Sequence, residues 1–416
     1  MTVSLDTKLS TKLSSKFSAQ LPSWMPRLAF APQGVAPRGD VLVCIFQRGA
    51  MDGLNALVPV GDSDYYRVRK NIAIAQPKVG DEKSAIDLDG FFALHPALRS
   101  LKPVWDEGLL APVHAAGSSD PTRSHFDAMQ YMEAGTPGSK TTTTGWLGRH
   151  LTTLNTGNTS PLRAVGMGNL LQASLRGPVP ATVLQSIADF HLRGKPEAVQ
   201  TFQKTLYALY TAKQTDPLLT AAAHDIDDTM SLLAKINVAS YKPASGVEYA
   251  KTEFALGMMQ IAQLIKADVG LEVACIDVGG WDTHANEGGA DGQMARLLKD
   301  LGDTLGAFTT DLREHMNHVL VVTMSEFGRR VSENAAGGTD HGHANCMFLI
   351  GGHVVGNQVH TQWPGLAKEN LHEGLDLKLT TDYRDVLCEV ITKRLGNTRI
   401  GQIFPDYTPH YRGVVS

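Results

Sequence analysis

Residues 337–346 read Gly-Gly-Thr-Asp-His-Gly-His-Ala-Asn-Cys, which places one carboxylate and two imidazoles inside a glycine-rich loop. Glycine frees the backbone but buries no side chain, so Asp340, His341 and His343 are candidates for chemistry. A carboxylate combined with imidazole nitrogens suits a divalent ion such as zinc or manganese. The alternative interpretation is a polar turn whose side chains are simply solvated.

Side chains of the same chemical kinds follow four apolar runs elsewhere in the chain. They are Asp52 after VLVCIFQRGAM, Ser124 and His125 after LLAPVHAAG, Asp282 and His284 after LEVACIDVGG, and Glu326 after VLVVTM. The apolar runs are short and partly β-branched, which is typical of buried strands. The candidate residues therefore follow the ends of predicted strands.

Each of these residues also has a simpler explanation. Asp52 precedes a glycine and could form a turn, and Ser124 precedes a helical pattern and could cap it. Asp282 and His284 lie two positions apart, a spacing that occurs by chance. Glu326 could pair with one of the two arginines that follow it in SEFGRR. Only their coincidence at one place in the fold would favour a shared site.

The elements that would position these residues are buried strands alternating with amphipathic helices. Apolar runs predict strands within 41–46, 109–117, 162–168, 271–280, 318–328 and 346–352. Helical spacing of apolar residues predicts helices within 291–316 and 382–396, the second ending on a glycine. This alternation predicts an α/β fold, a three-layer sandwich with a mostly parallel central sheet covered on both faces.

Ligands of an open α/β sheet bind beyond the carboxyl ends of its strands, where all the candidate residues fall. We therefore expect one metal site at that edge. A serine at a helix N-terminus beside a metal ion can lose its proton and attack phosphorus or sulfur.

Composition excludes several classes. The 416 residues are 43% hydrophobic and carry a formal net charge of −4, with no basic excess that would favour nucleic acid. No apolar run is long enough to predict a membrane span. The four cysteines are far apart and form no CxxC pair, so a disulfide framework is not expected. There is no GxSxG motif of an ordinary α/β-hydrolase.

Two segments differ from the rest of the chain. Residues 1–38 are basic and rich in Ser and Thr, and are predicted to be a flexible leader or a signal remnant before a domain spanning 39–416. Residues from about 185 to 265 are rich in Ala, Leu, Lys and Gln and show no clear strand pattern. They predict a helical insertion, which either caps the site or adds to the core.

Five motifs together resemble the bacterial domain-of-unknown-function family 1501: VLVCIFQRGAMDGLN, DPTRSHFDAMQYME, GGWDTHAN, VVTMSEFGRR and GTDHGHAN. The resemblance runs from about residue 39 to the C-terminus. That family is placed in the alkaline-phosphatase-like superfamily, which also holds sulfatases and phosphodiesterases. The resemblance implies an α/β sandwich, one or two divalent metal ions, and a Ser, Thr or formylglycine nucleophile. Zinc is the first expectation, with manganese, calcium or magnesium as alternatives.

The resemblance also implies roles for single residues. Asp52 resembles a first-strand metal ligand, and Ser124 resembles the nucleophile, with Thr122 and Ser119 as rivals because SDPTR is similar to the sulfatase motif CxPSR. Arg123 and His125 are then candidates for substrate binding.

The remaining implied ligands come from the later motifs. Asp282 and His284 resemble the superfamily's later ligands, although their DxH spacing replaces the usual DxxxH and leaves Asp277 as a rival. Glu326 would replace an aspartate. The implied metal set is completed by the loop residues Asp340, His341 and His343.

The resemblance implies metal-dependent hydrolysis of a phosphate or sulfate ester, with a small-molecule ester as substrate. The alternative is a non-catalytic metal-binding protein of the same fold that assists assembly or export of a protein partner. Many relatives in the family carry twin-arginine export signals, so the resemblance implies a periplasmic protein. LPSWMPRLAFAPQ stands where such a signal would end but lacks the arginine pair. Two alternatives stay open: the start is misassigned and the protein is periplasmic, or this copy stays in the cytoplasm.

Overall fold

The computed structural model describes residues 39–187, 201, 204–205, 207–209, 216–235 and 241–416. Within them, one sheet has the strand order β11-β5-β10-β9-β1-β8-β6-β7. Its strands are β1 (Val41–Gln47), β5 (Leu110–Gly117), β6 (Ala164–Met167), β7 (Thr182–Leu184), β8 (Val273–Val278), β9 (Val319–Ser325), β10 (Asn345–Gly351) and β11 (Thr381–Asp382). Every pairing is parallel except those of β10, which runs antiparallel to both β5 and β9. The predicted mostly parallel sheet is confirmed.

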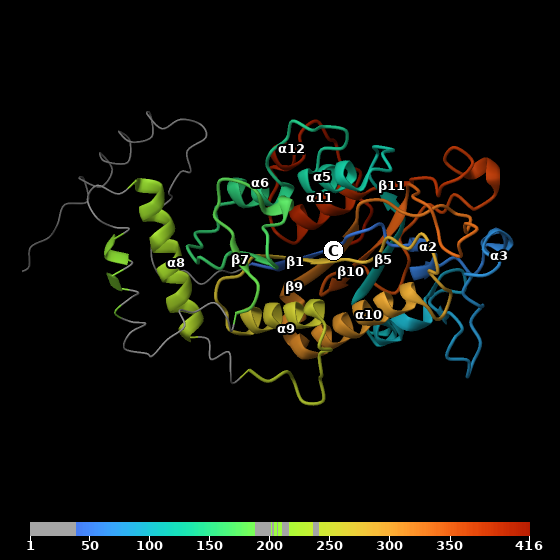
Figure 1. Cartoon of the computed structure of the whole chain (residues 1–416), viewed down its shortest axis with the longest axis horizontal. Coiled ribbons are helices and arrows are strands. Elements are labelled where there is room, and N and C mark those ends of the chain that lie inside the picture. Colours follow the sequence, from blue (N-terminus) through green and yellow to red (C-terminus); the bar gives the residue numbers. More distant parts are fainter. Residues whose placement is uncertain (1–38, 188–200, 202–203, 206, 210–215, 236–240) are drawn as a thin grey trace, which may run out of the picture.

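Helices cover both faces of this sheet (Figure 1). The described α-helices are α2 (Gly53–Ala56), α3 (Ser63–Val68), α4 (Lys102–Asp106), α5 (His125–Ala134), α6 (Trp146–Thr153), α8 (Pro217–Lys235), α9 (Glu253–Lys266), α10 (Gln293–Leu312), α11 (Tyr383–Lys393) and α12 (Ile400–Ile403). A small antiparallel sheet joins β2 (Leu57–Val58), β4 (Ala93–Leu94) and β3 (Ile86–Asp87). The molecule is a three-layer α/β sandwich, as the alternation of apolar runs and helical patterns predicts.

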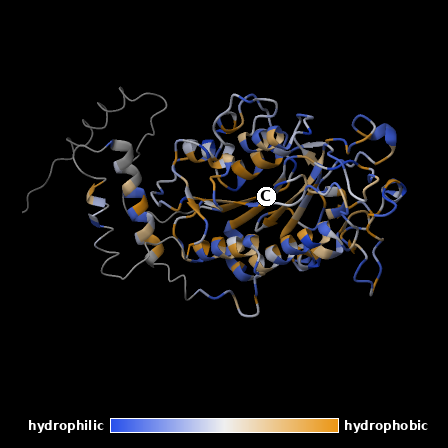
Figure 2. Ribbon diagram, viewed as in Figure 1, coloured by the Kyte–Doolittle hydropathy of each residue, from blue (hydrophilic) through white to orange (hydrophobic). Residues whose placement is uncertain are grey.

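Alternate residues of the central strand β1 belong to two separate cores. Val43 and Ile45 pack in the cluster that holds the buried residues of α9 and α10, whereas Leu42, Cys44 and Phe46 pack in the cluster with α6, α11 and α12. Successive side chains of a strand point to opposite faces, so a strand buried on both sides needs a continuous apolar run. Figure 2 shows this concentration of apolar residues in the central strands.

The predicted elements match the structure except at their ends. Each of the six apolar runs contains one strand, and the two helical patterns contain α10 and α11. α10 ends earlier than its pattern because Arg313, its C-cap residue, has a φ of 45°, outside the helical region. α11 starts after Asp382, whose side chain accepts a hydrogen bond from the backbone N–H of Arg384 and so caps the helix.

The predicted leader, residues 1–38, and much of the predicted insertion lie outside the described residues. Of the insertion, α8 and α9 are described. Phe254, Met258 and Ile261 of α9 are buried in the core against the sheet, so this helix adds to the core. A capping role for the rest of the insertion stays a prediction.

Two expectations about the whole chain can be compared with the structure. All four cysteines are buried free thiols, which agrees with the prediction of no disulfide framework. None of the described helices combines the length and the apolar character needed to cross a membrane.

The direction of β10 explains how the glycine-rich loop reaches the candidate site. The carboxyl ends of β1, β5, β8 and β9 share one edge of the sheet, because these strands run in the same direction. β10 runs the opposite way, so its first residue lies at that same edge. The loop of residues 337–344 therefore ends where the other candidate segments begin.

Candidate metal centre

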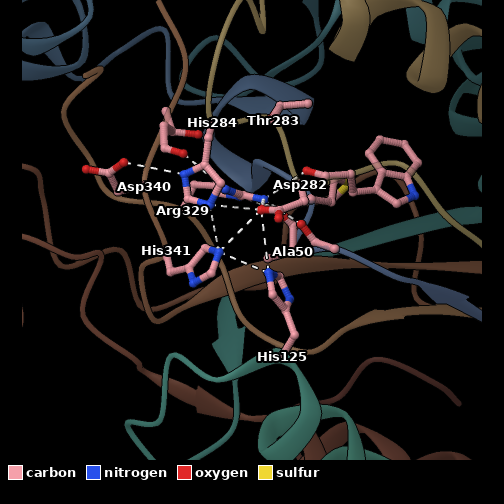
Figure 3. Close-up of polar contacts among 12 residues, drawn as sticks. Ala50, His125, Asp282, Thr283, His284, Arg329, Asp340 and His341 are labelled. Atoms are coloured by element: carbon pink, nitrogen blue, oxygen red, sulfur yellow. Dashed lines mark hydrogen bonds and ion pairs between the residues drawn. The ribbon is translucent and has the colours of Figure 1, made fainter. Parts of the chain in front are cut away.

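Three side chains converge at this edge and could hold a metal ion: His125, Asp282 and His341. Nε2 of His125 lies 2.9 Å from Nε2 of His341 and 3.5 Å from Oδ1 of Asp282, and the last two atoms are 3.2 Å apart. Nε2 of His284 joins the cluster at 2.9 Å from Nε2 of His341 and 3.1 Å from Oδ1 of Asp282. Figure 3 shows His125 below and His284 above the contact between Asp282 and His341. The structure thus brings together three predicted ligands, Asp282, His284 and His341, with His125, which was predicted to bind substrate.

The other ring nitrogen of each histidine faces an oxygen, which fixes the orientation of the ring. Nδ1 of His125 donates to Oε1 of Glu326 at 2.8 Å, and Nδ1 of His341 donates to the backbone carbonyl of Arg123 at 2.9 Å. Both acceptors require a proton on Nδ1, so neutral rings present bare Nε2 lone pairs to the centre. Metal-binding histidines are commonly oriented by carboxylates and carbonyls in this way.

His284 is oriented by the glycine-rich loop. Its Nδ1 lies 3.4 Å from Oδ1 of Asp340, and that carboxylate also accepts a hydrogen bond from the Asn334 side chain at 3.0 Å. Asp340 therefore orients a histidine and is not itself a member of the converging set. The sequence suggests Asp340 as a metal ligand, whereas in the structure its carboxylate lies beside Nδ1 of His284 and orients that ring.

The donor set fits a divalent transition metal. Ligands about 2.0–2.1 Å from a tetrahedral zinc ion lie about 3.3 Å from one another, close to the separations among His125, Asp282 and His341. Two bare nitrogen lone pairs 2.9 Å apart repel each other unless a cation or a proton lies between them. The hydrogen bond and charge of Glu326 raise the pKa of His125, and burial lowers the pKa of His341. A proton shared between these two rings is therefore the alternative to a metal.

Asp282 is kept ionised by a buried arginine. Nη2 of Arg329 donates to Oδ1 of Asp282 at 2.6 Å, and the same guanidinium donates to the backbone carbonyls of residues 49, 50, 281 and 339. Burial alone would raise the pKa of Asp282, but the hydrogen bond and charge of Arg329 outweigh it and lower the pKa to about 2. The spacing in SEFGRR allows an arginine to pair with Glu326, but in the structure Arg329 pairs with Asp282.

The cluster is open on one side. The side chains of Asp282 and His284 are 47% and 43% exposed, and those of His125 and His341 are 21% and 22% exposed. Glu326, behind His125, is buried. Structural zinc sites are closed by four protein ligands, whereas catalytic sites keep a position open to water or substrate. The exposure of Asp282 and His284 therefore resembles that of a catalytic site, with a position open to water or substrate.

Glycines in the loop allow its backbone to lie against the neighbouring segments. A Cβ on Gly338 would lie 2.4 Å from the carbonyl oxygen of Thr283, and one on Gly342 would lie 2.4 Å from the backbone of Arg329. No side chain fits at either position, so the loop can close over the strand ends only with glycine there. This close approach places His341 beside Asp282.

Asp52, expected to be a metal ligand, is placed elsewhere. Its carboxylate forms a bidentate ion pair with Arg69, and both side chains are fully buried. Burial would raise the pKa of Asp52, but the charge and hydrogen bonds of Arg69 lower it. With both oxygens held by a guanidinium and no water access, Asp52 does not join the described metal cluster. The structure places Asp52 in a buried ion pair with Arg69, apart from the converging set, and does not support its expected role as a ligand.

The candidate nucleophiles lie near the cluster in sequence, but their hydroxyls point to other partners. Ser124 is the N-cap of α5, and its Oγ accepts from the N–H of Asp127 at 3.4 Å. Oγ1 of Thr122 accepts from the N–H of Ser124, and Oγ of Ser119 accepts from Arg384. Within the described residues, none of these hydroxyls forms a hydrogen bond to the histidines or the aspartate of the cluster.

Three other candidates also have partners outside the cluster. Nε2 of His343 donates to the Ser118 carbonyl at 3.0 Å, and its ring packs against His372. The guanidinium of Arg123 is paired with acidic residues 373 and 376, so its clearest link to the site is the carbonyl that orients His341. Asp277, the rival of Asp282, is paired with Arg48. His125, expected to contact substrate, is a potential ligand.

Comparisons with known proteins give two distant structural likenesses and one family match. A search of curated proteins finds no match. Among solved structures, the lipoteichoic acid synthase LtaP from Listeria monocytogenes is 9% identical, with a TM-score of 0.32, over 79% of this chain and 67% of that one. A 2-O GAG sulfatase is 10% identical, with a TM-score of 0.28, over 77% of this chain and 66% of that one. Both likenesses are too distant to carry an argument, so the fold assignment rests on the sheet topology.

The family comparison is more direct. The family described as "Protein of unknown function (DUF1501)" matches residues 113–403, which is well over half of the chain and includes the whole converging cluster. The protein therefore belongs to the DUF1501 family.

Proposed function

We propose that this protein is a metal-dependent hydrolase of a phosphate or sulfate ester. The observation that carries the proposal is the convergence of the Nε2 atoms of His125 and His341 and a carboxylate oxygen of Asp282. Two of these groups are imidazoles whose other nitrogen is held by an oxygen acceptor. The nitrogen-rich set favours zinc over manganese, calcium or magnesium, which prefer oxygen ligands.

The metal would supply Lewis acidity, stabilising charge on an ester oxygen and lowering the pKa of an attacking hydroxyl or water. The chain would supply the rest of the site. Glu326 and the Arg123 carbonyl hold the two histidines in one tautomer. The Asp340–His284 pair lies at the exposed side of the cluster, where it can accept or return a proton.

An anionic ester would be received at the N-terminus of α5. His125 is the first residue of this helix, so the free N–H groups and positive dipole of its first turn lie beside the cluster. Ser124 immediately precedes it and is exposed. We keep Ser124 as the proposed nucleophile, because leaving its capping position would cost only about 1 kcal/mol.

A non-catalytic metal-binding role is the second candidate. The observation that favours it is that Oγ of Ser124 bonds to the N–H of Asp127 and, within the described part of the chain, to no member of the cluster. A protein of this kind would keep the fold and the metal for a partner in assembly or export.

An ester panel separates the two candidates. Metal-loaded wild-type protein should cleave at least one phosphate or sulfate ester, and Ser124→Ala should lower kcat by about a thousandfold or more, as loss of a nucleophile does. Thr122→Ala is the matched control, because that hydroxyl lies two residues away and should not alter kcat. Normal turnover by Ser124→Ala would reassign the nucleophile. Absence of cleavage by the metal-loaded wild type would make the non-catalytic role the better account.

A further inference from the structure

Behind the cluster, Glu287 contacts the two loops that carry the site residues. Its Oε2 accepts hydrogen bonds from the hydroxyls of Thr283, at 3.1 Å, and Thr339, at 2.7 Å. Thr283 lies between Asp282 and His284, and Thr339 precedes Asp340 and His341. One buried oxygen therefore joins the segment after β8 to the glycine-rich loop.

Backbone hydrogen bonds connect the same two segments. The N–H of Glu287 donates to the carbonyl of Gly337 at 2.9 Å, and the N–H of Thr339 donates to the carbonyl of Thr283 at 3.2 Å. The carboxyl of Glu287 thus adds side-chain contacts to a pairing of loops that is already formed. It fixes the residues immediately beside the predicted ligands.

The second oxygen of Glu287 presents a problem of hydrogen bonding. Oε1 is buried and has no hydrogen-bond partner among the described residues, and the carboxyl group of Glu287 lies beside that of Asp52. Asp52 already balances the charge of the fully buried Arg69. A second buried negative charge beside this pair would be uncompensated and costly.

A proton on Glu287 resolves both the charge and the missing donor. Oε2 already accepts from two hydroxyls, so the proton belongs on Oε1, where it can be donated to Asp52. All five N–H groups of the Arg69 guanidinium are already used, by Asp52, Asn55 and the carbonyls of residues 330 and 331. Arg69 therefore has no N–H left to donate to Glu287.

We propose that Glu287 is a positioning residue, a neutral carboxyl that shares its proton with Asp52 and holds the two loops of the metal centre in register. The consequence for the metal rests on the proposed function, whereas the protonation state does not. Burial, and then the neighbouring charge of Asp52, raise the pKa of Glu287 well above its ordinary value, which agrees with the hydrogen-bond count.

The full-length protein can be tested with two variants of similar size. Glu287→Gln keeps an acceptor for the two threonines and an N–H donor for Asp52, so it should bind Zn²⁺ with an affinity close to that of the wild type. Glu287→Leu removes both and should weaken Zn²⁺ binding by about tenfold, as loss of an outer supporting partner does. Asp311→Asn is the matched control, because this buried carboxylate pairs with Lys266 outside the metal cluster. It should leave Zn²⁺ affinity unchanged.

Infrared spectroscopy measures the proton itself. The wild type should show the carbonyl stretch of a protonated carboxyl at neutral pH, and this band should be absent from Glu287→Gln. A missing band in the wild type overturns the shared proton, even if no metal binds. Equal loss of Zn²⁺ affinity in both variants also overturns it, and wild-type affinity in folded Glu287→Leu overturns the positioning role. If wild-type protein binds no Zn²⁺, the proposed function fails separately while the infrared result still decides the proton.

Discussion

Two groups of charged side chains lie at the same edge of the sheet and differ in what neutralises them. The open cluster of His125, Asp282, His284 and His341 is partly exposed, with ring nitrogens directed at one another. The closed cluster of Asp52, Arg69 and Glu287 is fully buried and contains its own cation.

This difference in neutralisation distinguishes side chains that could bind a metal from side chains that only hold the site in place. A carboxylate whose two oxygens are held by a buried guanidinium has no electrostatic need for a metal. Bare imidazole lone pairs that face one another require a cation or a proton. We therefore propose that the open cluster binds the metal and that the closed cluster holds the surrounding loops in place.

The largest expected effect is on stability, in the closed cluster. Asp52→Ala leaves Arg69 buried and unpaired, so the free energy of unfolding should fall by about 3–5 kcal/mol. Urea unfolding followed by circular dichroism measures this. A decrease below about 1 kcal/mol would show that the pair is hydrated and that the contrast between the clusters is wrong.

The next effect is on metal affinity, in the open cluster. His341→Ala removes the ring that contacts each of the other members, so the affinity for Zn²⁺ should fall at least about a hundredfold, more than loss of an outer partner costs. Calorimetric titration measures the affinity. His343→Ala is the control from the same loop, because His343 bonds to Ser118. Equal losses in both variants would contradict the assignment.

A smaller effect is expected from the residue that orients His125. Glu326→Gln keeps the size of the side chain but replaces a charged acceptor of the Nδ1 proton with a neutral one, so Zn²⁺ affinity should fall about tenfold. The same titration measures it. An unchanged affinity would mean that the ring of His125 is oriented by packing, for example against Phe327.

The sequence predicted the sheet well, and also the sheet edge at which the candidate residues lie, because both depend on local patterns. Apolar runs identified the strands, and the rule that ligands bind beyond strand ends brought together Asp282, His284, Glu326 and His341. What it could not supply was the direction of β10. The glycine-rich loop precedes this strand, and it reaches the site because an antiparallel strand starts at the edge where its neighbours end.

The sequence also does not show which arginine pairs with which aspartate. Asp52 and Asp282 have the same chemistry and similar positions after a strand, and a sequence contains nothing that distinguishes their roles. The distinction comes from Arg69, 17 residues after Asp52, and from Arg329, which leaves Asp282 partly exposed. Such partners are fixed by tertiary packing.

The most direct test of the central claim is the metal content of the full-length protein. Purified without chelators, the wild type should contain about one equivalent of zinc or manganese per chain, and Asp282→Ala should contain much less, because it loses a ligand from a small set. Elemental analysis of both proteins, with circular dichroism to show that each is folded, gives the answer. A folded wild-type protein that takes up no divalent transition metal from any of several supplies would contradict the account, because the facing histidines would then be joined by a proton.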